Sequence, residues 1–267
     1  MSDNLTNESI AKPKFRHMLT EGRTLFELGA TSLLLPALMR APKGDGHPVM
    51  VLPGFLASDI STKPIRTFLN KKGYKATGWG LGRNLGTHIQ AHDNIVSDEL
   101  LDKVLEQYVK HNQKVSLIGW SLGGILSREI ARVIPDCIRQ VITLGSPFNG
   151  PKGAAPIAAK LFEMINGNIA EREPELLQKV FSPPPVPTTA IYSRSDGIAH
   201  WESCMDQAHK MHEQSENIEV KGSHMGLGHN AHVIWIVANR LAQAQGQWKP
   251  YHNNSEEQDR FSKLSEA

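Results

Sequence analysis

The sequence predicts an α/β fold with a mostly parallel central sheet flanked by helices, and two observations carry this prediction. From His47 onward, short apolar runs alternate with stretches of helical periodicity, which is the pattern of parallel strands joined by crossover helices. A length of 267 residues, with 40% apolar and 21% charged residues, is typical of a globular domain with one sizeable core. We therefore expect one α/β domain over residues 47–248.

The alternation sets the expected order of the elements. Buried strands are predicted at residues 48–53, 75–78, 115–119, 138–144, 188–192 and 218–220. Helices are predicted at residues 60–72, 97–111, 122–134, 202–212 and 230–244. The Gly-rich stretch 79–87 (WGLGRNLGT) is predicted to be a loop.

Three segments fall outside this alternation. Residues 1–46 are expected to form an N-terminal helical extension, and residues 249–267 a polar C-terminal tail. Residues 145–187 are rich in proline and glycine and include the run SPPPVP. Such an insertion between regular elements predicts a small cap or lid over the sheet.

Within the extension, the apolar segment Leu25–Met39 suits an amphipathic helix. It contains Gly29 and Pro36 and is shorter than the roughly 20 apolar residues that a membrane span requires. The apolar positions that suit such a helix are Leu25, Leu28, Leu35, Leu38 and Met39. We expect these side chains to cover the core rather than to contact a membrane surface, with a dimer contact and a flap over the site as the alternatives.

Charge and cysteine content narrow the classes of partner and compartment. A formal net charge of +2, without a dense Lys/Arg stripe, argues against a nucleic-acid partner. The N-terminus shows no continuous apolar run after a basic start, so no signal peptide is predicted. The two cysteines, Cys137 and Cys204, favour a reducing compartment, although a single bridge between them stays open. We therefore expect a soluble, cytoplasmic protein.

The strongest chemical motif is G-x-S-x-G at residues 119–123 (GWSLG). A buried strand is predicted immediately before Ser121 and a helix immediately after it, as a nucleophilic serine on a sharp strand-to-helix turn requires. Gly119 and Gly123 leave room for the close approach of strand and helix. We predict Ser121 as a nucleophile. The structural alternative is a small residue in a helix-starting turn.

A serine nucleophile needs a base, and in folds of this kind the acid and then the histidine follow the serine in the chain. Among twelve histidines, His224 lies in a glycine-bracketed loop (GSHMGLG) after the last predicted strand and before the last helix. We predict His224 as the base. His229 and His232 are the runners-up, with a structural alternative at the start and on the surface of the final helix.

The acid that orients the histidine is predicted to be Asp196. It follows the strand at residues 188–192 in the loop SRSDGI, where plain turn chemistry is the alternative explanation. Glu202 and Asp206 are weaker candidates because they fall within the following helical pattern.

Backbone N–H groups of Phe55 and Leu122 are the predicted oxyanion donors. Leu122 starts the helix after the serine, and Phe55 follows the first predicted strand in PGF. No metal is expected, because the His224, His229 and His232 cluster lacks a Cys or carboxylate at zinc-like spacing. No cofactor is expected either, since residues 79–87 lack the pattern of a phosphate loop.

With these residues assigned, the sequence resembles the bacterial α/β-hydrolase esterases and lipases over about residues 47–248. The segments that carry the resemblance are PVMVLPGF, GWGLGRNLG, IGWSLGG, TLGSPFNGP, YSRSDGIAHW and GSHMGLGHN, and they look like one lipase-like subgroup. The resemblance implies the α/β-hydrolase fold and hydrolysis of a small-molecule ester or lipid through an acyl-enzyme. The loop at Phe55 departs from the HGGG of many esterases.

Two other functions stay open. An acyltransferase could use the same residues to pass the acyl group to an alcohol or amine, and some relatives of the subgroup are described as acyltransferases. A non-catalytic binding protein on a hydrolase scaffold is the second alternative, because a fold alone does not determine function. The oligomeric state is not predicted.

Overall fold

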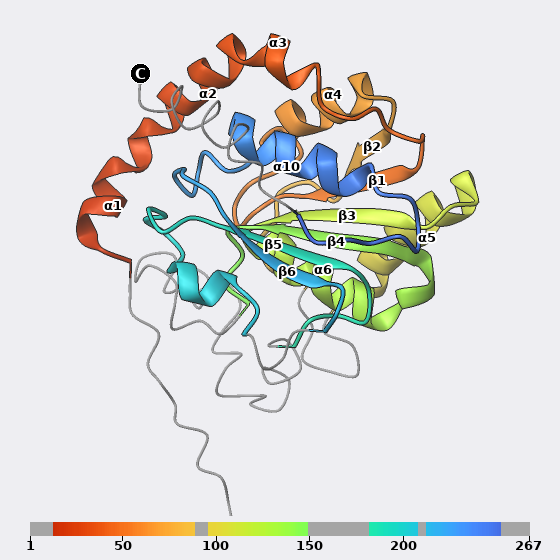
Figure 1. Ribbon diagram of the computed structural model, residues 1–267. Coiled ribbons are helices and arrows are strands. Elements are labelled where there is room, and N and C mark those ends of the chain that lie inside the picture. Colours follow the sequence, from red (N-terminus) through yellow and green to blue (C-terminus); the bar gives the residue numbers. More distant parts are fainter. Residues whose placement is uncertain (1–12, 89–95, 149–181, 208–211, 252–267) are drawn as a thin grey trace, which may run out of the picture.

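The computed structural model describes residues 13–88, 96–148, 182–207 and 212–251 (Figure 1). In this part of the chain, six parallel strands form one sheet in the order β2-β1-β3-β4-β5-β6. The strands are β1 (Pro48–Leu52), β2 (Lys75–Gly78), β3 (Val115–Trp120), β4 (Ile138–Leu144), β5 (Thr188–Tyr192) and β6 (Ser215–Glu219). The predicted parallel sheet is confirmed.

Helices cover both faces of this sheet and make a three-layer structure. On one face lie α4 (Lys63–Lys71) and α10 (Ala231–Leu241), and on the other lie α5 (Asp98–His111) and α6 (Leu122–Val133) (Figure 1). A short 3₁₀ turn, η2 (Pro135–Cys137), links α6 to β4.

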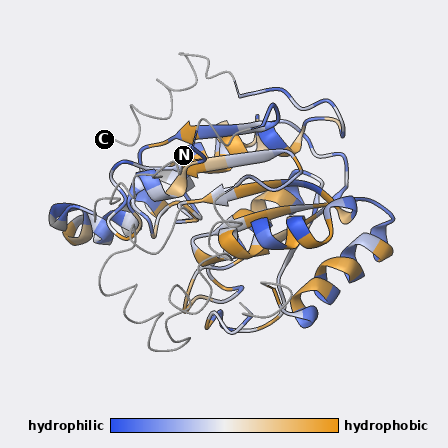
Figure 2. Cartoon of the chain, turned by 90° about the horizontal axis from the view of Figure 1, so that it is seen from below, coloured by the Kyte–Doolittle hydropathy of each residue, from blue (hydrophilic) through white to orange (hydrophobic). Residues whose placement is uncertain are grey.

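Successive side chains of a strand point to opposite faces of the sheet and contribute to two separate hydrophobic cores. In β1, Val49 and Val51 belong to the core under α4 and α10, whereas Met50 and Leu52 belong to the core under α5 and α6. Both faces are therefore buried, which explains why the strands are continuous apolar runs. Figure 2 shows hydrophobic and hydrophilic residues alternating along the helices, as expected for helices with one face on a core.

Local signals explain where the helices begin and end. The Ser97 side chain accepts a hydrogen bond from the Leu100 N–H and caps α5, and Asn230 caps α10 in the same way. At the other end of α5, Asn112 adopts the left-handed conformation with φ 49°. α6 ends at Val133, two residues before Pro135, which cannot continue an α-helix.

The predicted helix at residues 202–212 is wrong. A single 3₁₀ turn, η4 (Trp201–Cys204), stands at its start, residues 205–207 are not helical, and residues 208–211 lie outside the described part. The Asp206 N–H donates to the Asn217 side chain at 2.8 Å instead of to a helical carbonyl, and the Asp206 carboxylate is drawn into a buried ion pair. Tertiary contacts therefore override the local helical pattern.

The last strand begins earlier than predicted. β6 starts at Ser215, with three polar residues before Ile218 that the apolar pattern could not reveal. Glu216 is buried there because its carboxylate accepts hydrogen bonds from Thr189 at 2.8 Å and Arg240 at 3.0 Å.

Before β1, the chain forms short helices in place of one amphipathic helix over residues 25–39. These are α1 (Phe15–Leu19), η1 (Thr20–Arg23), α2 (Thr24–Leu33) and α3 (Leu35–Leu38). Pro36 lies in the first turn of α3, where its missing N–H breaks the continuity with α2. Both α2 and α3 pack against α10.

The break changes which side chains of this segment are buried. Leu38 is buried as expected, and Leu34 joins it in the core. Leu28, Leu35 and Met39 are 43%, 42% and 45% exposed, so the expectation that they cover the core is wrong.

The expectations on the cap, the two termini, the cysteines and a membrane span concern residues that the structure describes only in part. Most of the predicted cap, residues 149–181, lies outside them, as do residues 1–12 and 252–267. Cys137 and Cys204 are free cysteines, which answers the question of a bridge between them. None of the helices in the described ranges combines the length and hydrophobicity that crossing a membrane requires.

The ion pair between Arg128 and Asp206 should be a major contributor to the stability of the fold. Both side chains are fully buried, and the guanidinium meets the carboxylate through two bonds, of 2.7 and 3.1 Å. Removing one partner leaves an uncompensated buried charge, so Asp206→Ala is expected to lower the free energy of unfolding by about 3–5 kcal/mol. Urea unfolding measures this. The double variant Arg128→Met/Asp206→Leu should regain most of the lost free energy of unfolding. If Asp206→Ala loses no more stability than an ordinary surface substitution, the ion pair is not a major contributor.

Candidate active site

The predicted site residues follow the carboxyl ends of neighbouring strands. Ser121 comes directly after β3, Asp196 lies in the loop after β5, and His224 lies in the loop after β6. Because all strands are parallel, these ends lie along one edge of the sheet, where α/β folds place ligands.

The structure brings the three predicted side chains together in one chain of hydrogen bonds. His224 Nε2 lies 3.0 Å from Ser121 Oγ, and His224 Nδ1 lies 2.7 Å from Asp196 Oδ2. An ionised carboxylate only accepts hydrogen bonds, so Nδ1 carries the proton and Nε2 faces the serine as an acceptor. This is the geometry that a base needs to take a hydroxyl proton.

The carboxylate of Asp196 is fixed at its second oxygen as well. Asp196 Oδ1 accepts the backbone N–H groups of Ile198 and Ala199, each at 2.8 Å. These bonds compensate for a side chain that is only 3% exposed. The turn chemistry weighed as the alternative for Asp196 is therefore present, and it serves to orient the carboxylate toward His224.

Burial and charge act on the pKa of His224 in opposite directions. Burial of the ring alone would lower the pKa, but the negative charge of Asp196, its hydrogen bond to the ring and the charge of Glu21 raise the pKa above its ordinary value of 6.5. Ser121 itself is partly exposed, so its hydroxyl can be reached from outside.

The turn at Ser121 is strained and crowded. Its backbone has φ 53° and ψ −121°, a conformation that only glycine adopts readily. A side chain at Gly119 would overlap the backbone at residues 123 and 124, and one at Gly123 would overlap the end of β1. The glycines of the motif are thus required by the close packing of strand and helix.

The two residues predicted to supply oxyanion donors belong to segments that adjoin the serine. Leu122 is the first residue of α6, where backbone N–H groups have no acceptor within the helix. Phe55 follows Gly54, where an added Cβ would stand 3.2 Å from the Cβ of Ser121. The residue before Phe55 therefore lies against the nucleophile, and the role of the Phe55 N–H stays a prediction.

Asn84 holds the loop that carries Phe55, and the sequence reasoning missed it. The buried Asn84 side chain donates to the Pro53 carbonyl at 2.8 Å, and the Asn84 backbone carbonyl accepts the Leu56 N–H at 2.7 Å. Leu56 adopts a left-handed conformation with φ 61° in this turn. The stretch predicted only as a Gly-rich loop thus braces the loop after β1.

The runners-up are engaged elsewhere. The His229 ring lies 3.1 Å from the Thr24 hydroxyl of α2, and His232 lies in the first turn of α10. Glu202 lies 3.7 Å from His200 in η4, and Asp206 pairs with Arg128. None of them approaches Ser121 in place of His224 or Asp196.

A second Ser-His-Asp chain lies at the opposite edge of the sheet. His47 Nδ1 lies 2.5 Å from Asp45, and His47 Nε2 lies 2.8 Å from the Ser116 hydroxyl. His47 and Ser116 are both 0% exposed, and Ser116 sits within β3 rather than in a turn. This arrangement satisfies buried polar groups and offers no access to a substrate.

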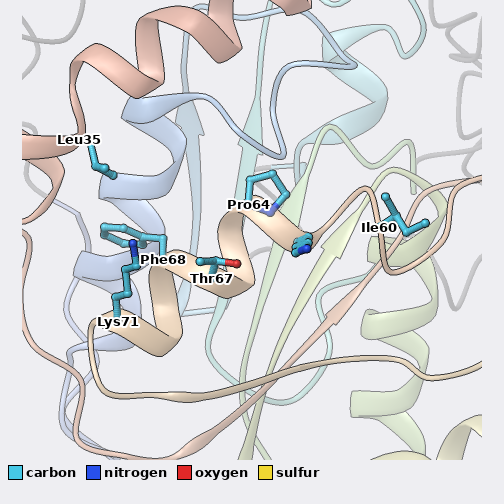
Figure 3. A pocket seen from close by; sticks show the side chains of 7 residues that line it. Leu35, Ile60, Pro64, Thr67, Phe68 and Lys71 are labelled. Carbon is cyan, nitrogen blue, oxygen red and sulfur yellow. The ribbon is translucent and has the colours of Figure 1, made fainter.

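Outside this edge, a groove lies between α3 and α4 (Figure 3). It is lined by Leu35, Ile60, Lys63, Pro64, Thr67, Phe68 and Lys71. None of these is a predicted site residue. Within the described ranges, no group of three or more His, Cys, Asp or Glu side chains is placed to hold a metal ion.

Contacts from the N-terminal segment reach both loops of the site, and these too were missed from the sequence. Glu21 and Glu27 accept backbone hydrogen bonds around His224, and Arg23 donates to Ser195 next to Asp196. The only sequence signal for these contacts was the presence of charged residues in and before an apolar segment. No local pattern indicated which loops these charged side chains would contact.

Comparison with known protein families gives a match over the part of the chain that carries the site. The model described as the PGAP1-like alpha/beta domain matches residues 82–234, more than half of the chain, and this stretch includes Ser121, Asp196 and His224. No curated protein matches the chain in sequence.

Solved structures share the fold at low sequence identity. The mature form of lipase BlEst2 from Bacillus licheniformis has a TM-score of 0.55 at 17% identity, over 77% of this chain and 95% of that one. Lipase B from Aspergillus fumigatus has a TM-score of 0.52 at 16% identity, over 76% of this chain and 54% of that one. The thioesterase domain from the curacin biosynthetic pathway has a TM-score of 0.50 at 16% identity, over 76% and 93%. The predicted α/β-hydrolase fold is confirmed.

The strain at residue 121 leads to a stability prediction. Ser121→Ala keeps the Cβ in a conformation with positive φ, whereas Ser121→Gly removes it. Relief of backbone strain exceeds the extra entropy that glycine loses on folding, so Ser121→Gly should be more stable than Ser121→Ala by about 1 kcal/mol. Denaturant unfolding of the two variants compares them directly, and a glycine variant no more stable than the alanine variant would show that the turn is unstrained.

Proposed function

Since the chain belongs to the PGAP1-like alpha/beta domain family, we propose that it is a serine hydrolase of carboxylic esters that works through an acyl-enzyme. The observation that carries this proposal is the continuous chain of hydrogen bonds from Asp196 through His224 to the partly exposed Ser121. It combines a nucleophile, a base and an orienting acid in the order and at the distances that such chemistry needs.

In the proposed reaction, Ser121 Oγ attacks the acyl carbon of the ester while its proton passes to His224 Nε2. The carbonyl oxygen becomes negative and accepts hydrogen bonds from the N–H groups of Phe55 and Leu122. When the tetrahedral intermediate collapses, the bond to the alcohol oxygen breaks and His224 returns the proton to the leaving alcohol. Water then attacks the acyl-enzyme in the same way, and the carboxylic acid leaves with Ser121 restored.

Asp196 has two tasks in this cycle. Its hydrogen bond keeps the proton of neutral His224 on Nδ1, so Nε2 is free to accept the serine proton. Its charge then stabilises the imidazolium that forms, and its two backbone bonds at Oδ1 keep the carboxylate in place throughout.

The names of the structural neighbours support the choice of acyl chemistry. Two are titled lipases and one a thioesterase domain, and all three share the fold of this chain. We propose oxygen esters of small molecules or lipids as the substrate class.

Replacement of the nucleophile tests the proposal. Ser121→Ala should reduce hydrolysis of p-nitrophenyl esters by about 10⁴-fold or more, because no other group can form the acyl-enzyme. The measurement is turnover of a series from acetyl to palmitoyl, whose profile also gives the preferred acyl length. Ser116→Ala is the matched control, since it removes the hydroxyl of the buried Ser-His-Asp chain and should leave turnover per folded molecule unchanged.

Either of two results would contradict the proposal. Ser121→Ala could retain wild-type turnover, or folded wild-type protein could fail both to hydrolyse the series and to react with a fluorophosphonate. The second result would favour a non-catalytic binding protein.

The raised pKa of His224 predicts the pH profile. Below its pKa the ring is protonated and cannot accept the serine proton, so kcat/KM should fall on the acid side with a midpoint above 6.5. Asp196→Asn removes the charge that raises the pKa, so the midpoint should move to lower pH and turnover should drop by several orders of magnitude. Profiles of both proteins measured from pH 5 to 9 decide this, and an unmoved midpoint in Asp196→Asn would exclude His224 as the titrating base.

A further inference from the structure

A carboxylate from outside the α/β domain joins the two loops of the site. Glu21, in η1, accepts the Gly197 N–H at 2.8 Å and the His224 N–H at 3.1 Å on one oxygen, and the Met225 N–H at 3.0 Å on the other. Gly197 directly follows Asp196. One side chain therefore binds the backbone beside the acid and at the base itself.

Neighbouring residues of the same segment anchor it to the same two loops. Glu27 accepts the N–H and hydroxyl of Ser223 at 2.8 and 2.7 Å, and Arg23 donates to the Ser195 hydroxyl at 2.8 Å. The fit is too close for larger residues in the loops, because a Cβ at Gly197 would overlap the backbone of His17 and one at Gly226 would overlap Glu27. Residues 13–39, the N-terminal arm, are thus fitted to the site.

The carboxylates of Glu21 and Glu27 differ in whether a cationic side chain neutralises them. Glu27 forms an ion pair with Arg23 at 3.2 Å, whereas no cationic side chain pairs with Glu21 among the residues that the structure describes. Three N–H donors satisfy the Glu21 carboxylate without neutralising it. A half-buried negative charge that bonds the backbone of His224 favours the protonated form of the His224 ring.

Other charged or titratable groups also face this pair of loops. Asp196 bonds the His224 ring, and the arm and η4 supply the rest, namely Glu21, Arg23, Glu27, His17 and His200. Of these, Asp196 and Glu21 are the two whose charges raise the pKa of His224.

We propose that Glu21 is a positioning residue of the active site, which holds the His224 and Asp196 loops in register and adds its negative charge to that of Asp196. The inference rests on the proposed roles of His224 and Asp196. Glu21 acts through His224 and not on the substrate. The N-terminal arm is accordingly part of the catalytic apparatus rather than a cover for the core alone.

Two variants of Glu21 separate its geometric role from its electrostatic role. Glu21→Gln keeps an oxygen for the Gly197 and His224 N–H groups but loses the charge and the bond to Met225. Glu21→Ala loses all three bonds. Glu106→Gln, which removes an exposed carboxylate paired with Lys103 on α5, is the control for a lost charge far from the site.

Kinetics on the p-nitrophenyl ester that wild type prefers provides the first readout. Glu21→Gln should move the acid midpoint of kcat/KM to lower pH, and Glu21→Ala should in addition lower kcat on the order of 100-fold with little change in KM, because a misplaced base slows the chemical step. Glu106→Gln should keep the wild-type kcat and midpoint. Thermal unfolding of each variant establishes that the protein measured is folded.

The second readout does not need turnover. The His224 imidazole signal in NMR, assigned by its loss in His224→Asn, is titrated in wild type and in Glu21→Gln. A lower pKa of His224 in Glu21→Gln supports the proposal even if no ester is hydrolysed. The absence of hydrolysis would contradict only the proposed hydrolase function. An unchanged titration, or equal losses of kcat in both Glu21 variants with an unmoved midpoint, would overturn the proposal and reduce the arm to a structural role.

Discussion

The bond between Asp196 and His224 is the interaction on which the rest of the site depends. A carboxylate that is almost fully buried is tolerated only when hydrogen bonds replace its water, and here the histidine and two backbone N–H groups do so. The surroundings are shaped to this pair. Gly145 has φ 54°, and a Cβ there would press on Leu227, Asp196 and the His224 ring, so the end of β4 must be glycine to admit them.

The His224 loop is held from three directions. Trp120, inside the serine motif, donates its indole N–H to the His224 carbonyl at 3.1 Å, which couples nucleophile and base through a side chain that the motif leaves unspecified. Directly after β5, the Ser193 hydroxyl donates to the Gly222 carbonyl at 2.7 Å. The N-terminal arm completes the support through Glu21 and Glu27. A loop without regular structure is thus fixed by hydrogen bonds from three separate parts of the chain.

Much of the architecture could be predicted from the sequence because its causes are local. Apolar runs located β1, β3, β4 and β5, and the alternation of elements located β2 and the end of β6. The strand-turn-helix pattern around Ser121 located the serine that the structure brings to His224 and Asp196. The failures have non-local causes. A helix was expected at Asp206 because its pattern is helical, yet its partner Arg128 stands 78 residues earlier. At the polar start of β6, Glu216 is buried because the distant residues Thr189 and Arg240 bond its carboxylate. The contacts of Glu21 span 176 to 204 residues, a separation at which no local pattern operates.

That separation has a consequence for the order in which the molecule is made. Chains grow at ~5–20 residues per second, so the His224 loop follows Glu21 out of the ribosome by roughly 10–40 s. When this interval ends, the chain already holds the arm, β1 to β5 and Gly197, but until then Ser121 has no histidine partner and Glu21 lacks its bond to His224. Ser121 therefore gains its histidine only after the loop that carries His224 has been made, which couples completion of the site to synthesis of that loop.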